Sequence, residues 1–201
     1  MEINLLILGC LFILTLFGVG ESVLKFFHLN KIFVLISLAL LISGLFAPNL
    51  NIDKFSVNIG YVLLPAIFSI IMLFKLKKPS KFLVAFFLVV LLTLAYSLIP
   101  MDEVLMLSYI PTLFFGLING ILLALLSNNF STCAISCFIG MNVGDMVFHL
   151  TRFENFSLLG NEFIFTSALI GIITFLIISF VLYKIGYYNK KVKIIAQTQS
   201  V

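Results

Sequence analysis

Seven apolar stretches fill almost the whole chain, and each is close to the roughly 20 residues that a membrane-spanning helix needs. They are Ile3–Gly20, Ile32–Pro48, Val57–Phe74, Phe82–Ile99, Val104–Ser127, Ser131–Leu150 and Glu162–Ile185. Because hydrocarbon offers the backbone no hydrogen-bond partners, each stretch has to satisfy its own N–H and C=O groups as a helix. The sequence therefore predicts an all-α, polytopic transmembrane bundle of about seven spans.

Composition excludes most other classes of protein. Apolar residues make up 62% of the 201 residues and charged residues 10%, whereas a soluble domain averages about 45–50% and about 25%. A soluble chain of this length could not hide so much hydrocarbon from water, and the same figures exclude a disordered chain. We expect a multi-pass protein of the cell membrane whose partner is the lipid bilayer and which, despite its net charge of +4, binds no nucleic acid.

The basic residues are distributed unevenly between the two sides that seven spans define. Ten of the twelve Lys and Arg residues fall in the connectors after the first and third spans and in the C-terminal segment, whereas only Lys54 and Arg152 fall on the other side. Cytoplasmic segments of membrane proteins carry an excess of basic residues. This pattern predicts an N-terminus outside the cell, a transmembrane domain over residues 1–186 and a basic, polar cytoplasmic tail over residues 187–201.

Two pairs of glycines have the spacing that lets helix backbones approach closely. They are Gly116 and Gly120 in the fifth span and Gly140 and Gly144 in the sixth. Pairs of small residues four positions apart form contact faces between membrane helices. We expect the fifth and sixth spans to pack tightly against each other or against a neighbour. The same faces could also bind another membrane protein or a second copy of the chain.

The three cysteines all fall within apolar spans, and there is no C-x-x-C motif. Cys133 and Cys137 are one helical turn apart and could in principle share a metal ion. A buried free cysteine more often behaves as a small hydrophobic residue, so we interpret the pair as a helix contact. No disulfide framework is expected.

Three polar residues near the end of the sixth span stand out from their apolar surroundings. Asn142, Asp145 and His149 are spaced i, i+3 and i+7, which places them on one face of a helix. A carboxylate inside a membrane is costly and is a functional hypothesis by default. We therefore expect this polar face to point into the bundle.

A second acidic residue, Glu162, opens the seventh span. The sixth and seventh spans are joined by a short connector, so Asp145 and Glu162 are expected near the outer ends of adjacent, antiparallel helices. Two carboxyl groups that share a proton form the acid–base device of aspartic proteases, and these two residues are our candidate catalytic pair. Two simpler interpretations remain open: Glu162 as an acid favoured by the helix dipole, and Asp145 as a partner of His149 or Arg152.

The pattern of these residues does not favour a metal or a cofactor. Asp145, His149 and Glu162 are chemically suitable metal ligands, but their spacing is irregular. The sequence contains no phosphate-binding loop, dinucleotide fingerprint, nucleophile elbow or HExxH motif. We expect neither a metal nor a cofactor.

Several stretches resemble a prokaryotic membrane family, the domain-of-unknown-function 1614 family. They are Gly18-Val-Gly-Glu-Ser-Val-Leu24, Val57-Asn-Ile-Gly60 followed by Pro65, and the Gly144-Asp145 step. The similarity is diffuse and runs from about residue 17 to residue 175, with the Asn-Ile-Gly…Pro stretch as its most specific part. The resemblance implies a multi-spanning membrane protein without an established activity.

The segment that begins at Glu162 also resembles the region after the second catalytic aspartate of presenilin-type intramembrane aspartyl proteases. In that family the first aspartate lies in the preceding helix, where Asp145 stands here. This chain departs from the family pattern: Leu159 and Asn161 stand at the two glycine positions, and Glu162 replaces the aspartate. The resemblance implies a hydrolase or a non-catalytic relative.

Three functional classes follow from the sequence. The first is an intramembrane hydrolase in which Asp145 and Glu162 share a proton and activate water. The second is a small proton-coupled carrier that uses Asp145 and His149 as a relay. The third is a structural or accessory subunit.

Overall fold

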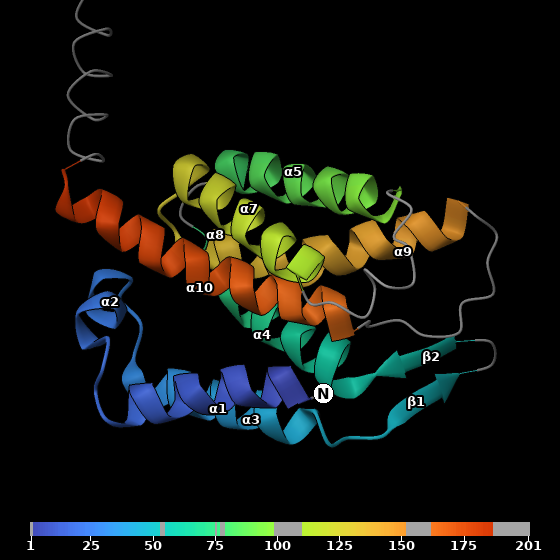
Figure 1. The fold of residues 1–201 in the computed structure, drawn as a ribbon, viewed down its shortest axis with the longest axis horizontal. Helices are drawn as coiled ribbons and strands as arrows, with labels where there is room; N and C mark the ends of the chain where they lie inside the picture. The colour runs from blue at the N-terminus through green and yellow to red at the C-terminus, as the bar shows by residue number, and fades with distance from the viewer. Residues whose placement is uncertain are drawn as a thin grey trace, which may run out of the picture.

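The structure is a computed structural model, and it describes residues 2–52, 55–74, 76, 79–98, 110–151 and 162–186. Its helices are α1 (Glu2–Leu16), α2 (Glu21–Phe26), α3 (Lys31–Gly44), α4 (Leu64–Leu73), α5 (Pro79–Leu98), α7 (Ile110–Leu126), α8 (Phe130–Ile135), α9 (Met141–Thr151) and α10 (Glu162–Lys184). Two π-helical turns, η1 (Ile59–Leu63) and η2 (Ser136–Gly140), lead into α4 and α9. The helices lie side by side with α10 running through the middle of the bundle (Figure 1).

Each of the seven apolar stretches contains a helix in the structure, so the helical fold class is confirmed. Three helices are long and apolar enough to cross a membrane: α5, α10 and the continuous helix Phe130–Thr151 formed by α8, η2 and α9. The helices Glu2–Leu16, Lys31–Gly44, Ile59–Leu73 and Ile110–Leu126 are apolar but shorter. The predicted tail, residues 187–201, lies outside the described residues, as do Lys54 and Arg152.

A short β-hairpin departs from the all-α expectation. Strand β1 (Asn49–Ile52) pairs antiparallel with β2 (Phe55–Asn58), with Asn49 opposite Asn58 and Ile52 opposite Phe55. Polar and apolar residues alternate along both strands, which is the period of a strand rather than a helix. The third apolar stretch therefore becomes helical only after Asn58. The hairpin projects beyond one end of the bundle (Figure 1).

The turn from the hairpin into α4 explains the Asn-Ile-Gly…Pro stretch physically. The Asn58 side chain accepts a 2.8 Å hydrogen bond from the backbone N–H of Tyr61, which caps the π-helical turn. Gly60 packs backbone to backbone against Gly44 at the end of α3, where any added Cβ would collide with the Gly44 carbonyl group. Pro65 falls in the first turn of α4, where its missing N–H costs little.

Three of the four paired glycines, Gly116, Gly120 and Gly144, lie at tight helix contacts. A Cβ on Gly116 would lie 2.7 Å from the Ser167 carbonyl oxygen, and one on Gly120 would lie 2.5 Å from the Gly171 carbonyl oxygen, so α7 packs directly on α10. A Cβ on Gly144 would lie 2.9 Å from the Val90 carbonyl oxygen of α5.

The helices from the fifth and sixth apolar stretches, α7 and α9, thus each pack closely against a neighbouring helix. The helix α7 packs against α10, which lies in the seventh apolar stretch, and α9 packs against α5, which overlaps the fourth. Gly140 makes only ordinary contacts, with Val89 and Phe86 of α5, because it stands at the end of the π-helical turn rather than inside a regular helix.

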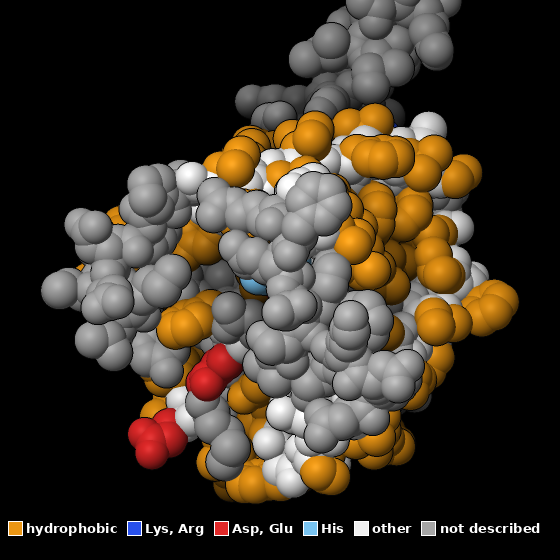
Figure 2. Space-filling view, turned by 90° about the vertical axis from the view of Figure 1, so that its right-hand side faces the viewer, with side chains coloured by type: hydrophobic (Ala, Val, Ile, Leu, Met, Phe, Trp, Pro, Cys, Tyr) orange, Lys and Arg blue, Asp and Glu red, His pale blue; other side chains and the backbone are white. Residues whose placement is uncertain are grey.

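The two ends of the bundle differ in charge. The four described lysines are Lys25 in α2, Lys31 and Lys81 in the first turns of α3 and α5, and Lys184 at the end of α10. These helix ends lie together on the left of Figure 1. Figure 2 shows the opposite end, where the described side chains in view include acidic groups and a histidine but no lysine or arginine.

Candidate functional site

Asp145 lies on α9 and is almost withdrawn from the surface, with 7% of its area exposed. The residue before it, Gly144, packs against Thr93 and Val90 of α5, so the backbone at this position is pressed against a neighbouring helix. The π-helical turn η2 ends five residues before Asp145 and sets its direction. Single π-helical turns within longer helices occur frequently at functional sites.

The charged partner of Asp145 among the described residues is on its own helix. The Oδ1 atom of Asp145 lies 3.7 Å from Nε2 of His149, within the range of an ion pair but longer than a hydrogen bond. The His149 side chain is 36% exposed and the Asp145 side chain 10% exposed. The imidazole therefore connects a buried carboxyl group to the outside of the described structure, which is the geometry a proton needs to reach it.

Asn142 has a different role from the one its spacing suggests. Its side-chain N–H donates a 2.6 Å hydrogen bond to the carbonyl oxygen of Phe138, within the π-helical turn. This bond ties Asn142 to the π-helical turn that precedes α9. It thus holds the segment that positions Asp145.

Glu162 is the first residue of α10, as expected. Its backbone carbonyl accepts a 2.7 Å hydrogen bond from the hydroxyl of Thr166, and that hydroxyl also lies 2.8 Å from Oδ1 of the fully buried Asn4. These contacts join the first turn of α10 to α1. Because α9 also contacts α10, Asp145 and Glu162 belong to two packed helices, while the residues that connect them, 152–161, lie outside the described residues.

The structure supports the helix-contact interpretation of the cysteines. Cys133 and Cys137 are buried free thiols whose sulfur atoms lie 3.9 Å apart. A Cβ on Gly171 would lie 3.2 Å from Sγ of Cys137, so this thiol fills the space above a glycine of α10. Within the part of the chain that the structure describes, no group of three or more His, Cys, Asp or Glu residues is arranged to hold a metal ion.

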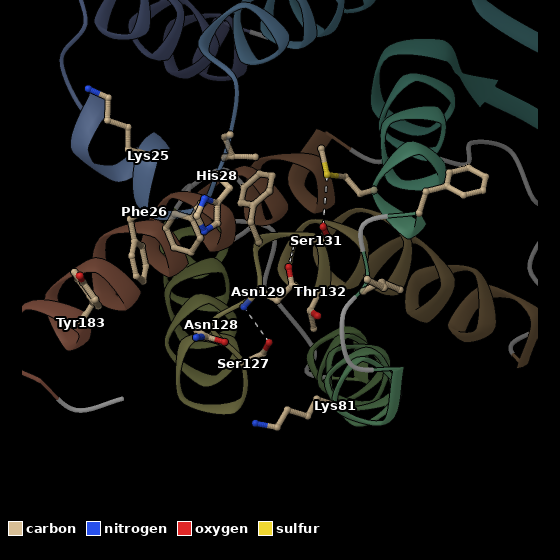
Figure 3. A pocket seen from close by; sticks show the side chains of 16 residues that line it. Lys25, Phe26, His28, Lys81, Ser127, Asn128, Asn129, Ser131, Thr132 and Tyr183 are labelled. Carbon is tan, nitrogen blue, oxygen red and sulfur yellow. Dashed lines mark hydrogen bonds between the residues drawn. The ribbon is translucent and has the colours of Figure 1, made fainter. Parts of the chain in front are cut away.

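A large cavity lies at the lysine-rich end, and sequence reasoning missed it. Its volume is about 860 Å³. Its polar lining comes from α2 and its following turn, α5, the connector between α7 and α8, and the start of α8: Lys25, His28, Lys81, Ser127, Asn128, Asn129, Ser131 and Thr132. Lys25 and Lys81 lie on opposite sides, with His28 and the asparagines between them (Figure 3).

The amphipathic connector after the first span was the one sequence signal of this cavity. It combines Lys25 and His28 with Phe26 and Phe27, a mixture that is typical of a segment lying along the membrane interface. In the structure its aromatic side chains pack inward: the ring centroid of Phe26 lies 4.6 Å from that of Tyr183, and that of Phe27 lies 5.5 Å from that of Phe175. The connector therefore closes one side of the cavity.

Comparisons of the chain with protein-family models, with curated proteins and with solved structures found no match.

Proposed function

We propose that the chain is a seven-span protein of the cell membrane, with its N-terminus outside and its tail in the cytoplasm. Seven apolar helical segments support this number, and the shorter helices are extended in the sequence by apolar residues beyond their described ends. The gathering of the described lysines at one end of the bundle supports the orientation, because basic residues accumulate on the cytoplasmic side. A multi-spanning member of the domain-of-unknown-function 1614 family would have this architecture.

Within this bundle we propose a proton-exchanging site through which protons cross the membrane, and this passage is the step that proton-coupled movement of a small solute would use. The observation that carries this proposal is the 3.7 Å approach of a buried carboxyl group, Asp145, to a partly exposed imidazole, His149. An ionisable pair of this kind is costly in a membrane protein and is typical of proton relays. His149 exchanges protons with water, and Asp145 stores the proton inside the bundle.

Proton uptake by proteoliposomes tests this function. Vesicles that contain the full chain and a pH-sensitive dye are given an external acid pulse while potassium and valinomycin clamp the membrane potential. We expect the native chain to acidify the interior faster than empty vesicles, and Asp145→Asn to return the rate to that of empty vesicles. Glu162→Gln is the control, because a relay through Asp145 and His149 does not need that carboxyl group. Equal rates for native chain and Asp145→Asn would overturn the proposal.

A second candidate is the acid-pair hydrolase, and the packing of α9 on α10 favours it. In that mechanism an ionised carboxyl group takes a proton from water, and the other carboxyl group donates its proton to the substrate carbonyl oxygen. The water oxygen bonds to the carbonyl carbon as the carbonyl π bond opens. Collapse of this adduct breaks the bond to the leaving group, which takes the proton from the carboxyl group that received it, while the hydroxyl proton returns to the other carboxylate. Cysteines placed at Asp145 and Glu162 in a chain lacking Cys10, Cys133 and Cys137 measure the separation directly. A disulfide between the two cysteines under mild oxidation supports the acid pair. If neither oxidation nor a short bifunctional thiol reagent links the two cysteines, the hydrolase proposal is wrong.

An accessory role remains the third proposal, with another membrane protein or a second copy as partner. The described contacts of Gly116, Gly120 and Gly144 are with helices of the same chain. Such a partner would therefore need an outer helix surface, such as the lipid-facing side of α5, where Val84, Phe87 and Leu91 are exposed.

A further inference from the structure

The polar cavity at the lysine-rich end has the chemistry of an anion site. Its described lining contains two lysines and a histidine and no acidic residue. The Lys25 ammonium group lies 3.4 Å from Glu21, which is outside the lining, and both side chains are largely exposed. Exposed ion pairs contribute little free energy, so Lys25 can leave Glu21 for an anion in the cavity at small cost.

The start of a long helix adds to this positive field. The continuous helix Phe130–Thr151 begins in the wall of the cavity, with Asn129 as its N-cap. Helix N-termini carry a partial positive charge and free N–H groups. The Asn129 Oδ1 atom accepts a 3.1 Å hydrogen bond from Ser131 N–H, whereas its buried Nδ2 atom has no hydrogen-bond partner among the described residues. The positive end of this helix thus lies in the wall of the cavity.

An apolar cavity adjoins the polar one. Its volume is about 140 Å³, and it lies between α1, α3, α4, the Phe130–Thr151 helix and α10. Thr15 and Ser37 are the polar residues among sixteen that line it, and the Ser37 hydroxyl already donates a 2.8 Å hydrogen bond to the Phe33 carbonyl oxygen. An apolar cavity of about 150 Å³ in a protein stays dry and accepts hydrocarbon.

The two cavities meet at shared residues. Leu29 and Phe130 line both of them. The two cavities are therefore neighbours, and a molecule that filled both would have a charged head and an apolar tail, joined beside these two side chains. The charge of the polar cavity requires the head to be an anion.

We propose that the two cavities together bind one lipid from the bilayer, an amphiphile with a phosphate headgroup and a hydrocarbon chain. The phosphate occupies the polar cavity beside Lys25, Lys81 and the start of α8. The first part of the hydrocarbon chain passes Leu29 and Phe130 and enters the apolar cavity. This site lies at the opposite end of the bundle from Asp145, so it stands independently of the proposed proton relay.

Native mass spectrometry of the full chain, released from nanodiscs, tests the proposal. The nanodiscs contain phosphatidylcholine with either phosphatidic acid, which presents a phosphate monoester, or phosphatidylserine. We expect one phosphatidic acid molecule to stay bound. The double variant Lys25→Gln/Lys81→Gln should weaken its binding by about 25-fold, at roughly fivefold for each lysine.

A matched control distinguishes binding in the cavity from general electrostatic attraction between the lysines and anionic lipid. Lys31 and Lys184 lie at the same end of the bundle but do not line either cavity. The double variant Lys31→Gln/Lys184→Gln removes the same charge and should retain binding within about twofold. Equal losses in both double variants would overturn the proposal, because the lipid would then be held by net charge alone.

The tail of the ligand is tested separately. Ser37→Leu fills part of the apolar cavity and should weaken the binding of phosphatidic acid. In a separate competition experiment with the native chain, inorganic phosphate and glycerol 3-phosphate should not displace the bound lipid. If glycerol 3-phosphate displaces the lipid fully and Ser37→Leu binds normally, the occupant is a soluble phosphate compound and the lipid proposal is wrong.

Discussion

The Thr166 hydroxyl lies 2.8 Å from Oδ1 of Asn4, and this contact joins the last described helix to the first across 162 positions of sequence. Both side chains are fully buried. The same hydroxyl lies 2.7 Å from the Glu162 carbonyl oxygen, so it has two acceptors for its one proton. The Nδ2 atom of Asn4 has no hydrogen-bond partner among the described residues. Asn4 therefore relies on Thr166 for its hydrogen bond, whereas the Thr166 hydroxyl has the Glu162 carbonyl oxygen as a second acceptor.

This asymmetry predicts that Thr166→Val destabilises the protein more than Asn4→Leu. Thr166→Val removes the one hydrogen-bond partner that the buried Asn4 amide has among the described residues, which costs about 1–3 kcal/mol. Asn4→Leu removes the unsatisfied amide itself and leaves the Thr166 hydroxyl its backbone acceptor, so we expect a change within about 1 kcal/mol.

Thermal unfolding in detergent, followed with a thiol-reactive fluorescent dye, measures this difference. The chain has no tryptophan, but Cys133 and Cys137 are buried and become reactive on unfolding. The exposed Cys10 is replaced by serine in the reference protein. A larger loss of stability in Asn4→Leu than in Thr166→Val would contradict this account of the contact.

The contact of α7 with α10 predicts that Gly120→Ala is strongly destabilising. The added Cβ would lie 2.5 Å from the Gly171 carbonyl oxygen, so the two backbones have to separate. Overpacking of this kind typically costs about 1–3 kcal/mol. Gly9→Ala in α1 is the matched control, because nothing lies within 4 Å of its added Cβ. We expect that variant to be neutral or more stable by up to about 1 kcal/mol, measured by the same unfolding assay.

The glycines show which helix contacts the sequence predicts and which it does not. The spacing of Gly116 and Gly120 predicted a close contact, but the choice of α10 as partner depends on Gly171, Ser167 and Thr174, which present small surfaces at matching heights. Complementarity between two distant segments has no signature in either one alone. The hairpin has a different explanation. Polar and apolar residues alternate along β1 and β2, which is typical of strands, but β2 overlaps the start of an apolar stretch that by length and hydropathy predicts a helix.

Asp145→Asn is expected to keep or raise the stability of the protein while it abolishes proton uptake. A buried carboxylate is costly, and asparagine has nearly the same shape without the charge. We expect a change in unfolding free energy between zero and about 1 kcal/mol in favour of the variant, which is the usual trade-off at a functional site. A clear loss of stability would instead identify Asp145 as a structural partner of His149.

The candidate site was only partly predictable. The apolar surroundings of Asp145 and its spacing to His149 sufficed to predict a buried carboxyl group beside an imidazole. The polar cavity could not be foreseen, because its lining comes from five separate parts of the chain, and residues such as Asn129 and Ser131 look like an ordinary helix cap when read alone.

Labelling of single cysteines in intact cells tests the proposed orientation. In a chain without its native cysteines, Asn155→Cys should react with a membrane-impermeant maleimide from outside. Gln199→Cys should react only after the membrane is permeabilised, because seven spans put the two positions on opposite sides. Equal labelling of both positions would indicate that the one predicted span between them, Glu162–Ile185, does not cross the membrane, and reversed labelling would indicate the opposite orientation.

The π-helical turn η2 makes the helix Phe130–Thr151 behave as if it carried one inserted residue. Each residue of an α-helix turns the chain by about 100°, so deletion of a single residue between Ser136 and Gly140 would restore a regular helix and rotate everything after it by that angle. Gly144 would leave α5, and Asp145 would swing away from its present surroundings. The direction of the carboxyl group is thus set by the number of residues in the turn that precedes α9, and length changes here should be far less tolerated than substitutions.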